Sequence, residues 1–263
     1  MRISAYTTVY NGLFWFSTIE QTIRSALEFA DEVIIVDGGS TDGTLNLIAD
    51  MNDDRIKVVF HPISKPDFLS SAERKNAGLE ACRGDYCVLL DADEVIPEWY
   101  TYNIRDVIKR NPETIAFHFS THHFYRSWNK IQTGTGWYQH KIYMIRNGLG
   151  IKHGPVKLDR DNFVFHDDEP IDNLLRDIVM ANISVFHYGW CRPDHVLLMK
   201  KWKQEREWWG NHYWNNTKFP FTFDNPKNLE HYGGKHPKVM RDLIKETWRW
   251  LPEFGDDYKE MFT

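Results

Sequence analysis

Strand and helix patterns alternate through about the first 95 residues, and this alternation is the feature that most constrains the fold. Short apolar runs predict strands, and apolar residues at helical spacing predict the helices between them. The predicted strands span residues 3–9, 33–36, 56–60 and 87–90, and the predicted helices span 16–29, 45–51 and 70–81, the last capped by Ser70 or Ser71. This order predicts an α/β fold with a mainly parallel sheet and helices on both faces.

The strand predicted near residues 87–90 runs directly into the acidic segment Asp91-Ala92-Asp93-Glu94. In extended chain, residues i and i+2 point to the same side, roughly 7 Å apart, so Asp91 and Asp93 are expected to project together. Hard divalent cations such as Mn²⁺ and Mg²⁺ take oxygen ligands and often complete their shell with substrate phosphates. The segment therefore predicts an anchor for a metal and a diphosphate. The alternative is that a carboxylate caps the helix expected to begin near Pro97.

A second acidic position follows an earlier predicted strand. Asp37 comes directly after the apolar run 33–36 and precedes a glycine-rich turn over 38–44. Ligands of open α/β sheets bind outside the carboxyl ends of the strands, which is where Asp37, Asp91 and Asp93 all fall. Two acidic sites at one edge of the sheet, its rim, suit a ligand that has a ribose or base at one end and a metal-bound diphosphate at the other.

Three motifs in this half of the chain resemble the family 2 glycosyltransferases of the GT-A fold. They are IIVDGGSTDGT at 34–44, the S-x-E-R-K-N-A-G helix, and LLDADE at 89–94. The resemblance implies a nucleoside-diphosphate sugar as donor, with a UDP-sugar favoured, and a Mn²⁺ or Mg²⁺ ion at Asp91 and Asp93. It implies donor contacts from Thr8, Asp37, Gly39, Lys75, Asp91 and Ala92. The chain departs from the family pattern at Gly38, where many members carry an acid, and at Lys75, where arginine is common.

The same resemblance implies two further site residues in the second half. Inverting transfer needs a group that takes the proton of the acceptor hydroxyl. Asp159 is the acid nearest the position where many members have Val-His-Glu; Asp161 and the acidic run 167–169 are other candidates, and a solvated acidic loop is the alternative for all of them. His187, in the segment FHYGW, matches a histidine that commonly completes the metal shell in GT-A enzymes. The alternative for His187 is a structural role.

The domain organisation predicted from these patterns is a GT-A domain over residues 1–190 with a helical extension over 191–263. Within the first domain, 1–96 forms the nucleotide-binding half and 97–190 the acceptor half. The aromatic-rich segment 125–138 either folds over a sugar or forms a small aromatic core. A helix is predicted over 194–209, and its basic and tryptophan side chains either contact a membrane surface or pack on the domain. A last helix is predicted from His236 to Pro252.

Composition and cysteine spacing indicate in which compartment the protein acts and which partners it binds. The net charge of −5 gives no general attraction to nucleic acid, although transfer onto hydroxylated DNA bases stays open. We see no signal peptide pattern, and no apolar run approaches the roughly 20 residues that span a bilayer. The three cysteines have no C-x-x-C spacing, which favours free thiols in a reducing compartment. A soluble, cytoplasmic protein is expected.

Together these features predict a metal-dependent inverting glycosyltransferase that acts on a glycan or a lipid-linked saccharide. One alternative is a protein of the same fold that binds a sugar nucleotide, or serves as a scaffold, without catalysis. A second is nucleotidyl transfer to a sugar phosphate. That reaction usually has a glycine-rich, basic loop after the first strand, which Tyr10-Asn11-Gly12-Leu13 is not.

Overall fold

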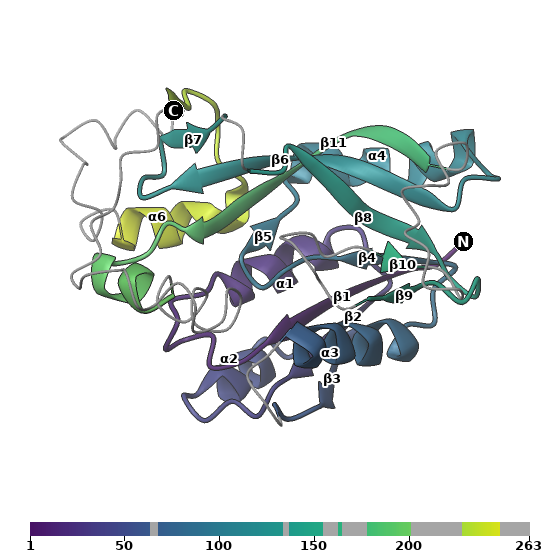
Figure 1. Ribbon diagram of the computed structural model, residues 1–263, viewed down its shortest axis with the longest axis horizontal. Helices are drawn as coiled ribbons and strands as arrows, with labels where there is room; N and C mark the ends of the chain where they lie inside the picture. Colours follow the sequence, from purple (N-terminus) through teal and green to yellow (C-terminus); the bar gives the residue numbers. More distant parts are fainter. Residues whose placement is uncertain (64–67, 134–136, 155–162, 165–177, 201–227, 248–263) are drawn as a thin grey trace, which may run out of the picture.

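The computed structural model describes residues 1–63, 68–133, 137–154, 163–164, 178–200 and 228–247. Its main element is a mixed sheet that, among these residues, has ten strands (Figure 1). They are β1 (Ile3–Val9), β2 (Glu32–Asp37), β3 (Ile56–Phe60), β4 (Tyr86–Leu89), β5 (Glu94–Val95), β6 (Ala116–Tyr125), β7 (Lys130–Gln132), β8 (His140–Arg146), β11 (Ile178–Trp190) and β12 (Leu229–His231). A separate pair joins β9 (Lys152–His153) to β10 (Phe163–Val164).

The strand order shows how the predicted parallel unit is extended. Strands β3, β2, β1 and β4 are parallel neighbours in that order. Strand β8 then pairs antiparallel with both β4 and β6, and β11 runs parallel to β6. The predicted α/β fold with a mainly parallel sheet is confirmed, with the antiparallel β8 inserted at its centre.

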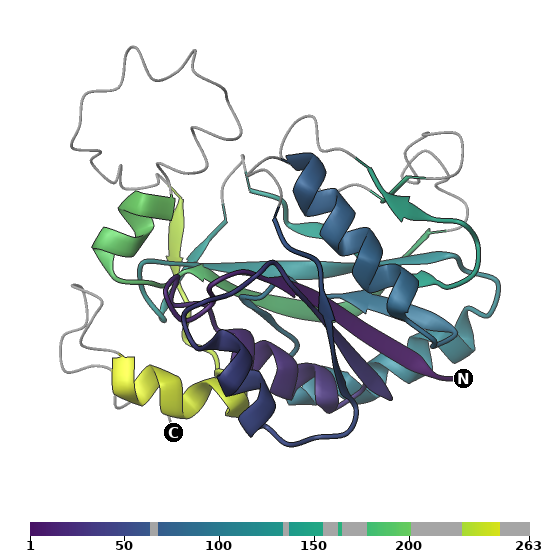
Figure 2. The same cartoon turned by 90° about the horizontal axis from the view of Figure 1, so that it is seen from below.

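Helices cover both faces of the sheet. They are α1 (Ile19–Leu27), α2 (Thr44–Asp50), α3 (Phe68–Ala81), α4 (Glu98–Arg110), the 3₁₀ turn η3 (Lys238–Met240) and α6 (Arg241–Thr247), and residues 194–200 are also helical. Figure 2 shows α3 on one face of the sheet and α1 with α4 on the other. Alternate residues of β2 point to opposite faces of the sheet. Val33 and Ile35 pack in the core with α1 and α4, whereas Ile34 packs in the core with α3.

One expectation and one alternative about helix ends are wrong. Helix α3 begins at Phe68, so Ser70 and Ser71 lie inside the helix and do not precede it. The N-cap of α4 is Pro97, and no side chain makes a capping hydrogen bond there. The carboxylates of the 91–94 segment therefore do not cap α4, which excludes the capping alternative for that segment.

The described part of the predicted C-terminal extension packs on the sheet. Met240 and Ile244 are fully buried in a cluster with Phe124 of β6 and with Phe186 and Tyr188 of β11. Residues 201–227 and 248–263, which include most of the predicted basic helix and the end of the last helix, lie outside the described residues. The division of the chain at residue 190 stays a prediction.

The three cysteines, Cys82, Cys87 and Cys191, are buried free thiols, as expected from their spacing. Among the described residues, no helix combines the length and the apolar character that crossing a bilayer requires.

Candidate active site

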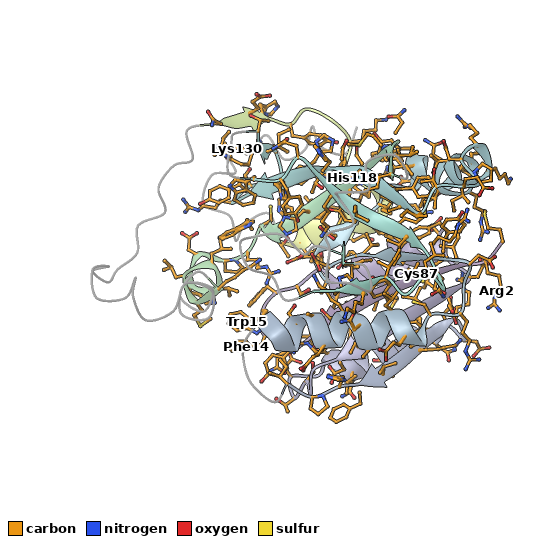
Figure 3. The ribbon with its side chains drawn as sticks, turned by 45° about the vertical axis from the view of Figure 1, so that its right-hand side comes forward. Arg2, Phe14, Trp15, Cys87, His118 and Lys130 are labelled. Atoms are coloured by element: carbon orange, nitrogen blue, oxygen red, sulfur yellow. The ribbon has the colours of Figure 1, made fainter. Side chains whose placement is uncertain are left out.

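The predicted donor residues gather at the carboxyl edge of the parallel strands. Asp37 ends β2 and lies opposite Val9 at the end of β1. On the other side of β1, the Leu90 amide donates a hydrogen bond to the Tyr6 carbonyl at 3.1 Å, just before the 91–94 segment. In Figure 3, Phe14 and Trp15 mark this edge, and Arg2, at the start of β1, marks the opposite one.

Asp37 is held by backbone amides through one of its two carboxylate oxygens. Its side chain is buried, and its Oδ2 accepts hydrogen bonds from the amides of Gly39 at 2.8 Å and Ser40 at 2.9 Å. Gly39 has φ +93°, a left-handed conformation that favours glycine. The buried Oδ1 has no hydrogen-bond partner among the described residues. An unpaired buried acceptor costs free energy, so this oxygen is an exception among buried polar groups.

Asp91 lies between two lysines from different elements. Its Oδ1 is 3.2 Å from Lys75 Nζ of α3, and its Oδ2 is 2.9 Å from Lys141 Nζ of β8. Burial raises the pKa of a carboxyl group, but Lys141 and Lys75 outweigh this effect and hold the pKa of Asp91 well below its usual range. Asp91 is therefore an anion at neutral pH, with two ammonium groups beside it.

Asp93 faces a different set of basic side chains. Arg192 Nη2 lies 2.5 Å from Asp93 Oδ2, Lys200 Nζ lies 3.6 Å from the same oxygen, and His187 Nε2 lies 3.5 Å from Oδ1. Burial opposes ionisation here too, yet Lys200, His187 and Arg192 hold the pKa of Asp93 well below its usual range. Burial, together with the charge of Arg192, lowers the pKa of Lys200 to about 8.

The two aspartates face different partners because the chain turns between them. Strand β4 ends at Leu89, and the Glu94 amide donates to the Asp91 carbonyl at 2.9 Å, which closes a turn over Ala92 and Asp93. The spacing rule for extended chain therefore does not apply to this pair. Glu94 is fully buried, and it supports the turn by accepting from the Asp91 amide at 2.8 Å and from the Tyr143 hydroxyl at 2.7 Å.

His187 is connected to a second histidine. Strands β11 and β6 are paired so that His187 lies directly beside His123, and the two Nδ1 atoms are 2.9 Å apart. His123 Nε2 is 2.7 Å from the Tyr138 carbonyl oxygen, to which it donates. Burial, assisted by the charges of His187 and Lys141, lowers the pKa of His123 to about 3, so this ring is neutral.

A glycine makes room for the pair formed by Asp93 and His187. A Cβ atom added at Gly189 would lie 2.5 Å from His187 Nε2 and 2.6 Å from Asp93 Oδ2. No side chain fits there without displacing both groups. A glycine inside a strand pattern often marks such a close approach, so the FHYGW segment carried a usable signal for this position.

The structure brings some of the predicted residues together and leaves others apart. Asp91 contacts Lys75, and Asp93 lies beside His187. Thr8, one register position from Asp37, is half-buried on β1, and the Ala92 carbonyl accepts from Ser17 Oγ at 2.6 Å. Within the described ranges, no group of three or more His, Cys, Asp or Glu side chains is arranged to hold a metal ion.

Asp159 lies outside the described residues, as do the alternative acids at 161 and 167–169. The described residues on either side of Asp159 are nevertheless placed, because Phe163 of β10 pairs with His153 of β9. Asn76, next to Lys75 on α3, fixes the His153 backbone through hydrogen bonds of 2.7 and 2.9 Å.

Residues 4–164, which are more than half of the chain, match the family model described as Glycosyl transferase family 2. The chain belongs to glycosyl transferase family 2. The predicted family is thereby confirmed, and the mixed, mainly parallel sheet with helices on both faces agrees with the predicted GT-A fold.

Two curated relatives match part of this chain. An uncharacterized glycosyltransferase of Haemophilus influenzae is 37% identical over 99 residues, covering 36% of this chain and 37% of the relative. The glycosyltransferase GlyG of Streptococcus pneumoniae is 31% identical over 100 residues, covering 36% of this chain and 31% of the relative. The chain thus spans about a third of the length of the curated relatives it matches.

Solved structures also resemble this glycosyltransferase. Staphylococcus aureus TarS 1–349 in complex with UDP-GlcNAc matches with a TM-score of 0.42 and 20% identity, covering 53% of this chain and 37% of TarS. The mannosyltransferase PcManGT from Pyrobaculum calidifontis, in complex with GDP-Man and Mn²⁺, matches with a TM-score of 0.49 and 15% identity, covering 83% of this chain and 66% of PcManGT.

Proposed function

We propose that this glycosyltransferase moves a sugar, with inversion and with a divalent metal ion, from a nucleoside-diphosphate sugar to an acceptor hydroxyl. The observation that carries the proposal is the pairing of two sites on one rim. One is Asp37 with its unpaired buried oxygen, and the other is the Asp91–Asp93 turn with four cationic side chains around it. These cations are Lys75, Lys141, Arg192 and Lys200.

The donor would lie along this rim. Asp37 Oδ1 would accept a hydrogen bond from the base or the ribose, next to Thr8 and the Gly39 turn. The backbone at Ala92 would adjoin the diphosphate, and Lys75 and Lys141 would pair with its oxygens as well as with Asp91. A UDP-sugar is the donor that we favour, because the resemblance implies an aspartate at the Asp37 position that contacts uracil or ribose.

The proposed position of the divalent ion is beside Asp93 and His187. A carboxylate and an imidazole nitrogen face each other across 3.5 Å, and only a glycine fits at position 189 beside them. This mixed oxygen and nitrogen set suits Mn²⁺ better than Mg²⁺, which prefers oxygen. Asp93 and His187 would hold the ion, with Asp91 as the neighbouring carboxylate. A bound ion would supply positive charge for the leaving diphosphate.

The remaining roles belong to side chains of the chain itself. Arg192 and Lys200 keep Asp93 ionised and oriented, as Lys75 and Lys141 do for Asp91. Asp159 would take the proton of the attacking hydroxyl, and the pairing of His153 with Phe163 fixes the ends of the segment that carries it. We propose a glycan or a lipid-linked saccharide as acceptor, and a reducing, cytoplasmic setting because the cysteines are free thiols.

Release of nucleoside diphosphate from a panel of nucleotide sugars, with and without Mn²⁺, tests the proposal. Asp93→Asn keeps the shape of the side chain but removes its charge, so we expect turnover to fall at least about a hundredfold. Asp54→Asn, an exposed change outside the site, is the matched control. Full activity of Asp93→Asn would exclude the proposed metal site, and donor binding without any turnover would favour the non-catalytic alternative.

A further inference from the structure

A cluster of three aromatic side chains lies at the same edge of the sheet as the acidic turn, and the proposed function gives it no role. The cluster consists of Tyr125 at the end of β6, Trp190 at the end of β11, and Trp137, which precedes β8. Tyr125 and Trp190 are register partners of the parallel strands β6 and β11. Because β8 is antiparallel to both β4 and β6, β6 and β11 end at the edge where β4 reaches the acidic turn (Figure 1).

The cluster and Asp37 lie on opposite sides of the acidic turn. Neighbouring strands follow in the order β2, β1, β4, β8 and β6, so Asp37 ends a strand on one side of β4 and the cluster begins on the other. Lys200 connects the cluster to the turn, because its Nζ lies 5.1 Å from the centre of the Trp190 ring and 3.6 Å from Asp93 Oδ2. A donor that extends from Asp37 to the turn would therefore carry its sugar toward the cluster.

The three rings form a corner. The centroids of Trp137 and Trp190 are 5.4 Å apart, and their planes meet at 63°. The Tyr125 ring lies 6.0 Å from Trp137 at 88° and 5.9 Å from Trp190 at 37°. Tyr125 is buried, whereas both tryptophans are half-buried. The cluster thus has a buried base and two partly exposed indole rings that are inclined to each other.

This arrangement favours a saccharide over a nucleobase as the ligand. The face of an aromatic ring carries partial negative charge and attracts the weakly positive C–H groups of a sugar ring. A chair-shaped sugar has C–H groups on more than one side, which suits two walls that meet at 63°. A flat base stacks best between parallel walls, and the net charge of −5 gives no general attraction to DNA.

The backbone beside the cluster is held in an unusual conformation. Arg126, which follows Tyr125, has φ +53°, a left-handed conformation that is uncommon for residues other than glycine. Its amide donates to the Trp190 carbonyl at 3.0 Å, and its Nη2 donates to both carboxylate oxygens of Asp194 at 3.1 Å. Strained backbone of this kind is concentrated at functional sites. These bonds join the ends of β6 and β11 and so fix the base of the corner.

We propose that Trp137 and Trp190 bind the saccharide part of the acceptor, with the apolar face of a sugar ring against the two indoles. The inference rests on the proposed function, because it names the acceptor class of that site. Both tryptophans determine specificity and take no part in bond formation. Binding of a saccharide in the corner is therefore measurable without donor, metal ion or turnover.

Two substitutions of Trp137 separate binding from packing. Trp137→Phe keeps an aromatic face, whereas Trp137→Leu keeps an apolar side chain without one. Trp99→Leu is the matched control, because Trp99 is a tryptophan on α4 that is 41% exposed and lies outside the cluster. A purely structural role would make Trp137→Phe and Trp137→Leu similar in saccharide binding. The binding role makes only phenylalanine a functional replacement.

The first measurement is a titration with the methyl glycosides of glucose, galactose, mannose and N-acetylglucosamine, followed by ¹H–¹⁵N NMR of the indole groups. The Trp137 signal is identified by its absence in Trp137→Phe. We expect at least one glycoside to shift the signals of Trp137 and Trp190 but not that of Trp99. If none of the four glycosides shifts the Trp137 signal, the proposal is overturned. This wild-type spectrum is decisive even where a variant does not fold.

The same titration, followed on the glycoside signals, gives the affinity of each variant. Loss of the aromatic face should weaken binding at least about tenfold in Trp137→Leu, with a change of less than about threefold in Trp137→Phe and in Trp99→Leu. Wild-type affinity in Trp137→Leu would contradict the proposal.

The second measurement is release of nucleoside diphosphate from nucleotide sugars with the bound glycoside, with a duplex that contains 5-hydroxymethylcytosine, or with water as acceptor. We expect the glycoside alone to accelerate release. In Trp137→Leu, kcat/KM for the glycoside should fall at least about tenfold, while hydrolysis by water stays unchanged. Transfer to the duplex and not to the glycoside would overturn the proposal. Glycoside binding at Trp137 without release from any donor would contradict the proposed function alone.

Discussion

Arg192 and Asp93 form a buried ion pair that joins the acidic turn to the chain after β11. Arg192 Nη2 lies 2.5 Å from Asp93 Oδ2, while Nη1 donates to the Trp15 carbonyl at 2.6 Å. The two side chains are 6% and 14% exposed. One guanidinium group thus connects the acidic turn to the loop that follows β1.

Removal of this guanidinium should destabilise the protein. Arg192→Ala would leave the Asp93 carboxylate buried with only weaker partners, and we expect the free energy of unfolding to fall by about 3 kcal/mol. Urea denaturation measures the change. Arg24→Ala, which breaks the exposed pair with Glu20, is the control and should cost less than about 0.5 kcal/mol. Equal losses of unfolding free energy in the two variants would show that the buried pair contributes no more stability than the exposed pair.

Asp37→Asn should weaken nucleotide binding with little effect on the fold. The amide keeps one oxygen for the Gly39 and Ser40 amides but replaces the unpaired Oδ1 by a donor. A hydrogen bond to a charged group contributes about 1.5–3 kcal/mol, so we expect UDP affinity to fall roughly 10–100-fold. Calorimetric titration of UDP measures it. If UDP affinity were unchanged in Asp37→Asn, the nucleoside would not contact Asp37.

Gly189→Ala should reduce metal affinity because the added Cβ would lie within 2.6 Å of both Asp93 and His187. We expect the dissociation constant for Mn²⁺ to rise at least tenfold, measured by electron paramagnetic resonance with UDP present. Gly233→Ala is the matched control, since a Cβ there would meet only His231, at 3.8 Å. Wild-type affinity in Gly189→Ala would argue against a metal at this pair.

Glu32 should contribute stability that is lost in acid. Its burial opposes ionisation, but Lys57, Ser4 and the Arg83 amide lower its pKa to about 2, against an ordinary value of 4.5. The carboxylate stabilises the folded state fully above pH 4.5, and this contribution disappears as the pH falls through 2. Because solvent screens the half-exposed Lys57, Glu32→Gln should cost about 2 kcal/mol at pH 7, with the difference from wild type narrowing below pH 4.5. If the difference in unfolding free energy between wild type and Glu32→Gln stayed constant with pH, the lowered pKa of Glu32 would be contradicted.

The sequence predicted the elements that local pattern determines. The apolar runs at 3–9 and 56–60 coincide with β1 and β3, and the run at 33–36 lies within β2. The start of α3 was misplaced because serine residues are tolerated inside a helix as well as at its cap. Asp37 was found because it directly follows an apolar run, which fixes its position at the edge of the sheet.

Site residues that depend on long-range pairing could not be predicted from the sequence. Lys141 reaches Asp91 only because β8 pairs antiparallel with β4, and Arg192 and Lys200 reach Asp93 from the chain after β11. Nothing in the local pattern around these cations marks them. The orientation of Asp93 could not be predicted either, because the chain stops being extended where the turn at Ala92 begins.

The most direct test of the central claim is thermal unfolding with a panel of nucleoside diphosphates, each with and without Mn²⁺. Ligand at a hundredfold excess over its dissociation constant stabilises the folded state by about 2.7 kcal/mol, which should raise the Tm by about 5 °C or more. We predict such a shift with UDP, larger with Mn²⁺, and a loss of the Mn²⁺-dependent part in Asp93→Asn. No shift with any nucleoside diphosphate would mean that Asp37 and the Asp91–Asp93 turn do not form a donor site.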